Sequence, residues 1–240
     1  MTLEENLALV RRSVAEAARE AGRDPAEITL EAATKTRSAD TIREAIAAGV
    51  TVCGENRVQE MAAHLEENAY DGAALHFIGR LQTNKVRQVV GRVDLIESVD
   101  SLRLLECIER ESARLELRQD ILLEVNIGGE ASKGGIPPEE LAALALRARE
   151  LPHVRLRGLM AIPPRACSEG ENRRFFAQMR ELFVDIKGRL DDNRNDMDCL
   201  SMGMSGDYAD AVREGATLIR LGTALFGPRP APEEKTTTQN

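Results

Sequence analysis

A lysine follows the first apolar run of the chain, where its side chain could act as a reactive amine. Residues 28–35 read Ile-Thr-Leu-Glu-Ala-Ala-Thr-Lys and predict a β-strand that ends at Lys35. A lysine at a strand end beside an apolar core loses hydration, and this loss favours the neutral amine. The neutral amine is the form that makes a Schiff base with a carbonyl compound. A solvated lysine at a strand end would show the same pattern.

Two turns rich in small residues stand near the end of the chain. Residues 201–207 read Ser-Met-Gly-Met-Ser-Gly-Asp, and residues 220–224 read Arg-Leu-Gly-Thr-Ala. Backbone N–H groups at such turns, helped by a helix dipole, favour phosphate. Two ordinary tight turns are the alternative. A nucleophilic role for Ser205 is rejected, because Asp207 stands where the hydrolase motif Gly-x-Ser-x-Gly needs its last glycine.

Other polar residues also follow predicted strands. Asn56 is a candidate ligand contact and also a candidate cap of the next helix, with Gln59 three residues later as in a capping box; capping does not exclude ligand contact. Arg220 would point inward from the last strand, where a buried structural ion pair is the alternative. Lys85 and Lys133 lie after a strand and in a glycine-rich connection, respectively, and a solvated loop is the simpler interpretation of that connection.

Short apolar runs alternate with helical patterns along the whole chain. The predicted strands cover 28–35, 50–53, 75–78, 94–97, 121–126, 155–160, 198–202 and 218–221. The predicted helices cover 39–48, 57–68, 101–113, 138–150 and 173–189, after an amphipathic helix that opens the chain. Eight such units predict a single (β/α)8 barrel over residues 1–227, with an open doubly wound sheet as the alternative. Residues 228–240, rich in Pro, Glu and Thr, predict a disordered tail.

Composition excludes several classes of protein. A net charge of −8 argues against a nucleic-acid-binding surface. The four cysteines show no Cys-x-x-Cys spacing and there are only three histidines, so a structural zinc site has little support. No run approaches the about 18 apolar residues of a membrane span, and the first residues lack the pattern of a signal peptide. We therefore expect a cytoplasmic protein, and a monomer, because a complete barrel buries its own core.

The order and spacing of these motifs resemble the pyridoxal phosphate homeostasis protein family, whose barrel is similar to the N-terminal domain of bacterial alanine racemases. The resemblance runs from the opening helix to about Gly227. The matching strings lie at 34–36, 54–56, 76–79, 81–82, 84–85, 132–133, 157–163, 201–205 and 220–227. One departure is Ser38, which stands where the family frequently has a proline.

By this resemblance the chain binds pyridoxal 5'-phosphate (PLP), with Lys35 forming the Schiff base. Ser205, Gly222 and Thr223 would hold the phosphate. Arg220 would face the pyridine nitrogen, and Asn56 would lie near the ring. An arginine beside that nitrogen disfavours its protonation, so the ring is a weaker electron sink.

Three functions follow from this chemistry. The first is a PLP-binding protein that stores, buffers or delivers the cofactor without turnover and transiently meets PLP-dependent apoenzymes; Lys85 or Lys133 would receive cofactor in transit. The second is a PLP-dependent, racemase-like enzyme acting on amino acids. Related racemases use a tyrosine base from a second domain, whereas this chain has only Tyr70 and Tyr208 and no such domain, which favours the carrier. The third is a cofactor-free Schiff-base aldolase.

Overall fold

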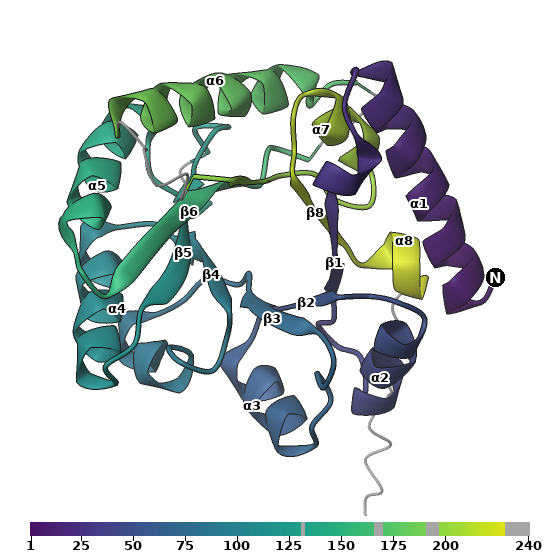
Figure 1. Ribbon diagram of the computed structural model, residues 1–240, viewed down its shortest axis with the longest axis horizontal. Coiled ribbons are helices and arrows are strands. Elements are labelled where there is room, and N and C mark those ends of the chain that lie inside the picture. The colour runs from purple at the N-terminus through teal and green to yellow at the C-terminus, as the bar shows by residue number, and fades with distance from the viewer. Residues whose placement is uncertain (131–132, 166–169, 191–196, 229–240) are drawn as a thin grey trace, which may run out of the picture.

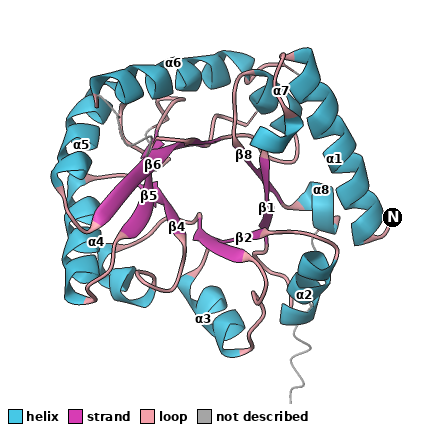
Figure 2. Ribbon diagram, in the orientation of Figure 1, coloured by secondary structure: helices cyan, strands magenta, loops and turns pink. Residues whose placement is uncertain are grey.

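Eight parallel strands form a closed barrel in chain order, from β1 to β8. The computed structural model describes residues 1–130, 133–165, 170–190 and 197–228. Figures 1 and 2 show the strands in a ring with the helices outside it. The predicted (β/α)8 barrel is confirmed, and the open sheet is excluded. Of the expected tail, residues 229–240 lie outside the described residues.

The strands and helices alternate as the sequence predicts. The strands are β1 (Thr29–Ala33), β2 (Val52–Glu55), β3 (Ala74–Phe77), β4 (Leu95–Val99), β5 (Gln119–Val125), β6 (Val154–Ala161), β7 (Cys199–Ser201) and β8 (Leu218–Leu221). The helices are α1 (Leu3–Glu20), α2 (Ala39–Ala47), α3 (Val58–Glu66), α4 (Leu102–Arg114), α5 (Pro138–Glu150), α6 (Arg173–Arg189), α7 (Tyr208–Arg213) and α8 (Thr223–Phe226). Short 3₁₀ helices cover η1 (Pro25–Glu27) and η2 (Thr83–Gln88), and η2 takes the place of a helix after β3.

The opening helix α1 is an addition to the barrel. Thr2 and Glu5 form a reciprocal capping box at its start. Its apolar side packs beside α7 and α8, and Asn6 Nδ2 donates a hydrogen bond to the Leu225 carbonyl at 2.8 Å (Figure 1). The predicted N-terminal helix is therefore confirmed. Within the described part of the chain, no helix combines the length and apolarity that crossing a bilayer requires.

The first strand is shorter than predicted. It ends at Ala33, and Lys35 lies in a turn rather than at the end of the strand. The chain bends there because Thr36 has a φ of 63°, a left-handed conformation that ends β pairing. Lys35 still leaves the barrel at the carboxyl end of β1, the end at which ligand sites of such barrels lie.

Two apolar clusters hold the barrel together. The larger one fills the layer between the strands and the helices. The smaller one lies inside the barrel and consists of Leu95, Leu122, Met160, Cys199 and Leu218, with Ile162 packed against it. Polar side chains from the same strands are buried beside this small cluster, which is where the fold departs from a purely apolar interior.

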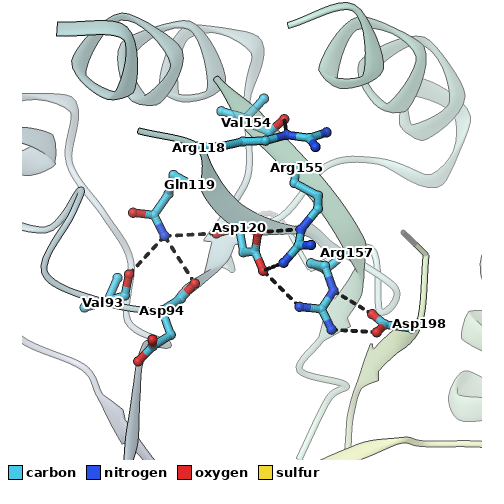
Figure 3. Close-up of polar contacts among 9 residues, drawn as sticks. All are labelled: Val93, Asp94, Arg118, Gln119, Asp120, Val154, Arg155, Arg157 and Asp198. Carbon is cyan, nitrogen blue, oxygen red and sulfur yellow. Dashed lines mark hydrogen bonds and ion pairs between the residues drawn. The ribbon is translucent and has the colours of Figure 1, made fainter. Parts of the chain in front are cut away.

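An ion-pair network ties together the amino-terminal ends of β5, β6 and β7 (Figure 3). Asp120 accepts hydrogen bonds from Arg155 and, at 2.9 Å, from Arg157 Nη1. Arg157 also donates hydrogen bonds to both carboxylate oxygens of Asp198, at 2.7 and 2.6 Å. These hydrogen-bonded partners hold the pKa of Arg157 above its ordinary value, despite partial burial. The network fixes the end of the barrel that lies away from Lys35.

Candidate active site

Strand pairing brings Lys35 beside the second glycine-containing turn. β1 and β8 close the barrel, with Ala32 paired to Leu221. One residue further on, Gly222 lies against Ala33, because a Cβ placed on Gly222 would be 3.9 Å from Ala33 Cβ. Lys35 follows Ala33 by two residues and is half-buried. The structure therefore brings the predicted amine and the predicted anion-binding turn to the same mouth of the barrel.

The residue before Lys35 is locked into the fold. The Thr34 hydroxyl donates to Glu55 Oε1 at 2.6 Å, and the Thr34 amide donates to the Gly54 carbonyl at 3.0 Å. The same Glu55 oxygen accepts a hydrogen bond from the Tyr70 hydroxyl at 3.0 Å. These side chains are buried, so the network is shielded from water. Lys35 thus leaves the sheet from a rigid anchor.

Tyr70 belongs to the buried hydrogen-bond network around Glu55. Burial and the adjacent Glu55 carboxylate hold its pKa above the ordinary value, so the phenol keeps its proton. Its hydroxyl also lies 3.1 Å from His64 Nδ1. The structure places it in the anchor behind Lys35, where it does not face the barrel mouth as an acid–base group.

Ser205 joins the two small-residue turns. Its Oγ accepts hydrogen bonds from the amides of Gly222 at 3.3 Å and Ala224 at 3.1 Å. Asp207 shapes the turn, since its Oδ1 accepts the Met204 amide at 2.7 Å. The two amides therefore converge on the Ser205 oxygen, so the turn after β8 presents backbone donors at one place, as anion-binding turns do.

Thr223 extends this cradle. It is the first residue of α8 and is exposed, while the Gly222 carbonyl accepts the amides of Leu225 and Phe226. The three predicted phosphate-binding residues Ser205, Gly222 and Thr223 are therefore adjacent in space.

Arg220 points into the barrel from β8, as predicted. Its Nη2 donates to the Ala161 carbonyl at 2.9 Å, and its Nη1 donates to Ser201 Oγ. Ser201 Oγ in turn donates a hydrogen bond to Glu97 Oε2 at 2.6 Å. Burial by itself would raise the pKa of Glu97, but the hydrogen bond from His76 and the charge of Arg220 hold that pKa below its ordinary value. Arg220 is therefore fixed and charge-balanced.

Asn56 is not a helix cap. α3 begins at Val58, which makes Arg57 the capping residue, with no side-chain cap bond. The capping alternative for Asn56 is therefore wrong. Its Oδ1 is enclosed and accepts no hydrogen bond from any described residue. The backbone of Asn56 packs so tightly on Gly79 that a Cβ there would lie 2.0 Å from the Asn56 carbonyl oxygen. The side chain is held with an unused acceptor.

A carboxyl group from β5 completes the mouth. Burial, followed by the charge of Asp100, raises the pKa of Glu124 to about 7, against the opposing charges of Arg220 and Arg80. The sequence interpretation missed this residue. Strand alternation from residue 120 onward would have placed it on the same face as Leu122, inside the barrel.

The two other candidate lysines differ from Lys35. Lys133 Nζ donates to the Pro163 carbonyl at 3.0 Å and pairs with Glu130 at 2.5 Å, which ties the connection after β5 to the end of β6. Lys85 lies half-buried in η2. The neighbouring motif residue Ser132 lies outside the described residues.

Known proteins share this chain's sequence and fold. The family model for the N-terminal domain of alanine racemase matches residues 6–230. The pyridoxal phosphate homeostasis protein of Pseudomonas aeruginosa is 43% identical over 95% of this chain and 96% of its own. The protein of the same name from Aquifex aeolicus is 41% identical over 94% of this chain and 97% of its own. The chain belongs to the pyridoxal phosphate homeostasis protein family.

A solved structure extends this family relationship to three dimensions. PipY of Synechococcus elongatus with PLP bound has a TM-score of 0.83 and 36% identity, covering 94% of this chain and all of that one. Membership in the pyridoxal phosphate homeostasis protein family, together with the alanine racemase domain match, confirms the resemblance inferred from the motifs.

Proposed function

We propose that this chain binds PLP as a Schiff base on Lys35 and acts in intracellular PLP homeostasis, storing, buffering or delivering the cofactor without turnover. The observation that carries the proposal is the β1–β8 pairing, which places Gly222 against Ala33, two residues before Lys35. The amine of Lys35 and the small-residue turn at Gly222 therefore follow the carboxyl ends of two adjacent strands, β1 and β8. The names of the relatives and the PLP-bound PipY structure support the same ligand.

The residues present fit PLP. Ser205, Gly222 and Thr223 would hold the phosphate, whose oxygens would take the backbone donors that converge on Ser205 Oγ. The unused Oδ1 of Asn56 would lie near the ring and take a donor. Lys35 Nζ would bind the aldehyde carbon as a Schiff base.

Bound PLP supplies a carbonyl group for amines and an electron sink for carbanions. Arg220 restrains the second of these, because a guanidinium is permanently charged and disfavours a proton on an adjacent pyridine nitrogen. Tyr70 offers no base, since its hydroxyl is buried on Glu55. The chain's own residues therefore favour holding the cofactor over transforming a substrate.

Transfer and turnover are separable in one experiment. The PLP-loaded chain is mixed with an apoenzyme that needs PLP, and acceptor activity is followed while D-alanine formation from L-alanine is measured in parallel. We expect transfer without sustained D-alanine. Lys35→Ala should lose loading, whereas Lys187→Ala, a lysine on α6, should keep it. Steady D-alanine formation that depends on Lys35 would replace the carrier with a racemase-like enzyme.

Several finer points of this proposal stay predictions. We also propose that the protein is cytoplasmic, that it is a monomer, and that it contacts PLP-dependent apoenzymes transiently. Lys85 and Lys133 enter as transit positions, and alanine variants of either that release PLP at the wild-type rate would remove them from it.

A further inference from the structure

Three potential metal ligands converge inside the barrel, separately from the Lys35 mouth. They are Glu31 on β1, His76 on β3 and Glu97 on β4, and one donor atom from each lies within 4.8 Å of the others. His76 Nδ1 is 2.8 Å from Glu97 Oε1 and 3.7 Å from Glu31 Oε2. Glu31 and Glu97 are 0% exposed and His76 is 8% exposed. Two carboxylates and an imidazole are therefore enclosed together.

Glu31 pairs with His76 only at 3.7 Å, which is longer than a hydrogen bond. Neither of its carboxylate oxygens has a hydrogen bond within the described structure. The fold nevertheless makes room for this side chain, because a Cβ on Gly54 of the neighbouring strand would lie 1.6 Å from Glu31 Oε1. A buried carboxylate without a hydrogen bond is costly, and native proteins satisfy such groups with another group, water or an ion. The carboxylate is aimed at the place where His76 and Glu97 meet.

Glu97 is already oriented for ligation. Its Oε2 accepts the Ser201 hydroxyl at 2.6 Å and lies 3.9 Å from Arg220 Nη1. These contacts leave Oε1 directed at His76 Nδ1. Hydrogen bonds of this kind, behind a ligand, fix its orientation in metal sites.

We propose that Glu31, His76 and Glu97 bind one first-row divalent cation of the Zn²⁺ class. Donors held at about 2.1 Å from such a cation lie about 3.0–3.5 Å apart, close to the two separations that His76 makes. An imidazole with two carboxylates suits Zn²⁺ better than Mg²⁺ or Ca²⁺, which prefer oxygen ligands alone. Three protein ligands leave a fourth position for water. Binding would require His76 Nδ1 to give up its proton to solvent.

A cavity of about 430 Å³ at the amino-terminal end of the barrel touches this cluster through His76, which is one of its lining residues. The charged side chains that line it are four carboxylates and one guanidinium: Glu27, Asp94, Asp120, Asp198 and Arg157. Figure 3 shows the last three of these paired with one another at this end. An excess of negative charge favours entry of a cation over entry of an anion.

Calorimetric titration of the chelator-treated, full-length chain with Zn²⁺ tests the proposal. The wild type should bind one Zn²⁺, and Zn²⁺ should raise its unfolding temperature. Glu31→Gln keeps the shape of the side chain and removes its charge, so it should bind at least about tenfold more weakly and lose the temperature shift. Glu66→Gln, which removes an exposed carboxylate on α3 outside the cluster, should bind like the wild type. The thiols are the same in all three proteins, so their contribution cancels.

Two results would overturn the site. The first is a wild type that binds no Zn²⁺, in which case a proton on Glu31 satisfies the cluster instead. The second is equal binding by Glu31→Gln and the wild type. His76→Gln adds a further test if it folds, and Glu31→Gln decides the question if it does not. None of these readouts involves PLP, so the metal site and the proposed function stand or fall separately.

Discussion

The hydroxyl of Thr34 donates a hydrogen bond to Oε1 of Glu55 across 2.6 Å, between adjacent strands of the barrel. Both side chains are 0% exposed. Because Thr34 directly precedes Lys35, this bond fixes the direction in which the lysine leaves β1. The Tyr70 hydroxyl donates a second hydrogen bond to the same Glu55 oxygen. Glu55, on β2, therefore connects the end of β1 with the segment after α3.

Thr34→Val should test this anchor. Valine keeps the volume but cannot donate, so Glu55 loses a partner and the free energy of unfolding should fall by about 1–3 kcal/mol. Thr29→Val, on an exposed residue at the start of the same strand, should change it by less than about 0.5 kcal/mol. Urea denaturation measures both. Equal stabilities for the two variants would show that the hydrogen bond does not anchor the turn.

Thr36 should respond to relief of backbone strain. Its φ of 63° is unfavourable for a β-branched residue, and Glu60 Oε2 accepts its amide at 3.1 Å to hold the turn. Asparagine tolerates this conformation, so Thr36→Asn should raise the free energy of unfolding by about 0.5–1 kcal/mol. A loss of stability in denaturant titration would contradict stored strain beside Lys35.

Ser205→Ala should separate phosphate binding from Schiff-base formation. Removing the hydroxyl costs about 1–2 kcal/mol, so PLP affinity should fall roughly tenfold. Affinity for pyridoxal, which has no phosphate, should stay within about twofold, as measured by imine absorbance in equilibrium titrations. An equal loss for both compounds would place Ser205 outside the phosphate cradle.

Glu124 should make stability depend on pH. Its pKa is raised from 4.5 to about 7, first by burial and then by Asp100. The folded chain therefore holds this proton more tightly than the unfolded chain, and wild-type stability falls as pH rises through that window. Glu124→Gln stays neutral, so the variant should gain stability relative to the wild type as pH rises: the difference in free energy of unfolding (variant minus wild type) should be about 1–3 kcal/mol higher at about pH 8 than at about pH 4.

An exposed glutamate provides the control for that comparison. Glu66→Gln removes a carboxyl on α3 that is exposed to water, and it is measured in parallel. The account of Glu124 fails if its variant and the Glu66 variant follow the wild type in parallel across the pH range.

Much of this architecture could be predicted from periodicity alone. Each of the eight strands overlaps the apolar run that predicted it, although the bounds differ at most of them, and Pro138–Glu150 and Arg173–Arg189 match their helices residue for residue. Such elements can be predicted locally, because the spacing of apolar residues along the chain shows which face of a helix or strand is buried. Closure of β1 onto β8 joins residues almost two hundred positions apart, and only the structure could establish it.

Some residues of the candidate site could likewise be predicted from the sequence, and others could not. Lys35 and Arg220 could be placed because strand ends and strand alternation are local. Asn56 was also predicted as a possible helix cap, which the structure excludes because α3 begins one residue later than a cap at Asn56 requires; its contact with a ligand stays a prediction. The cluster of Glu31, His76 and Glu97 shows no ligand spacing along the chain, since each residue comes from a different strand.

The most direct test of the central claim is where borohydride fixes PLP. The full-length chain is mixed with PLP, reduced and digested, and the modified peptide is identified by mass spectrometry. We predict one phosphopyridoxyl group, on Lys35, with loss of the imine absorbance band in Lys35→Ala and its retention in Lys187→Ala. An unmodified Lys35, or an unchanged band in Lys35→Ala, would contradict the account and return the cofactor-free aldolase as the better explanation of the barrel.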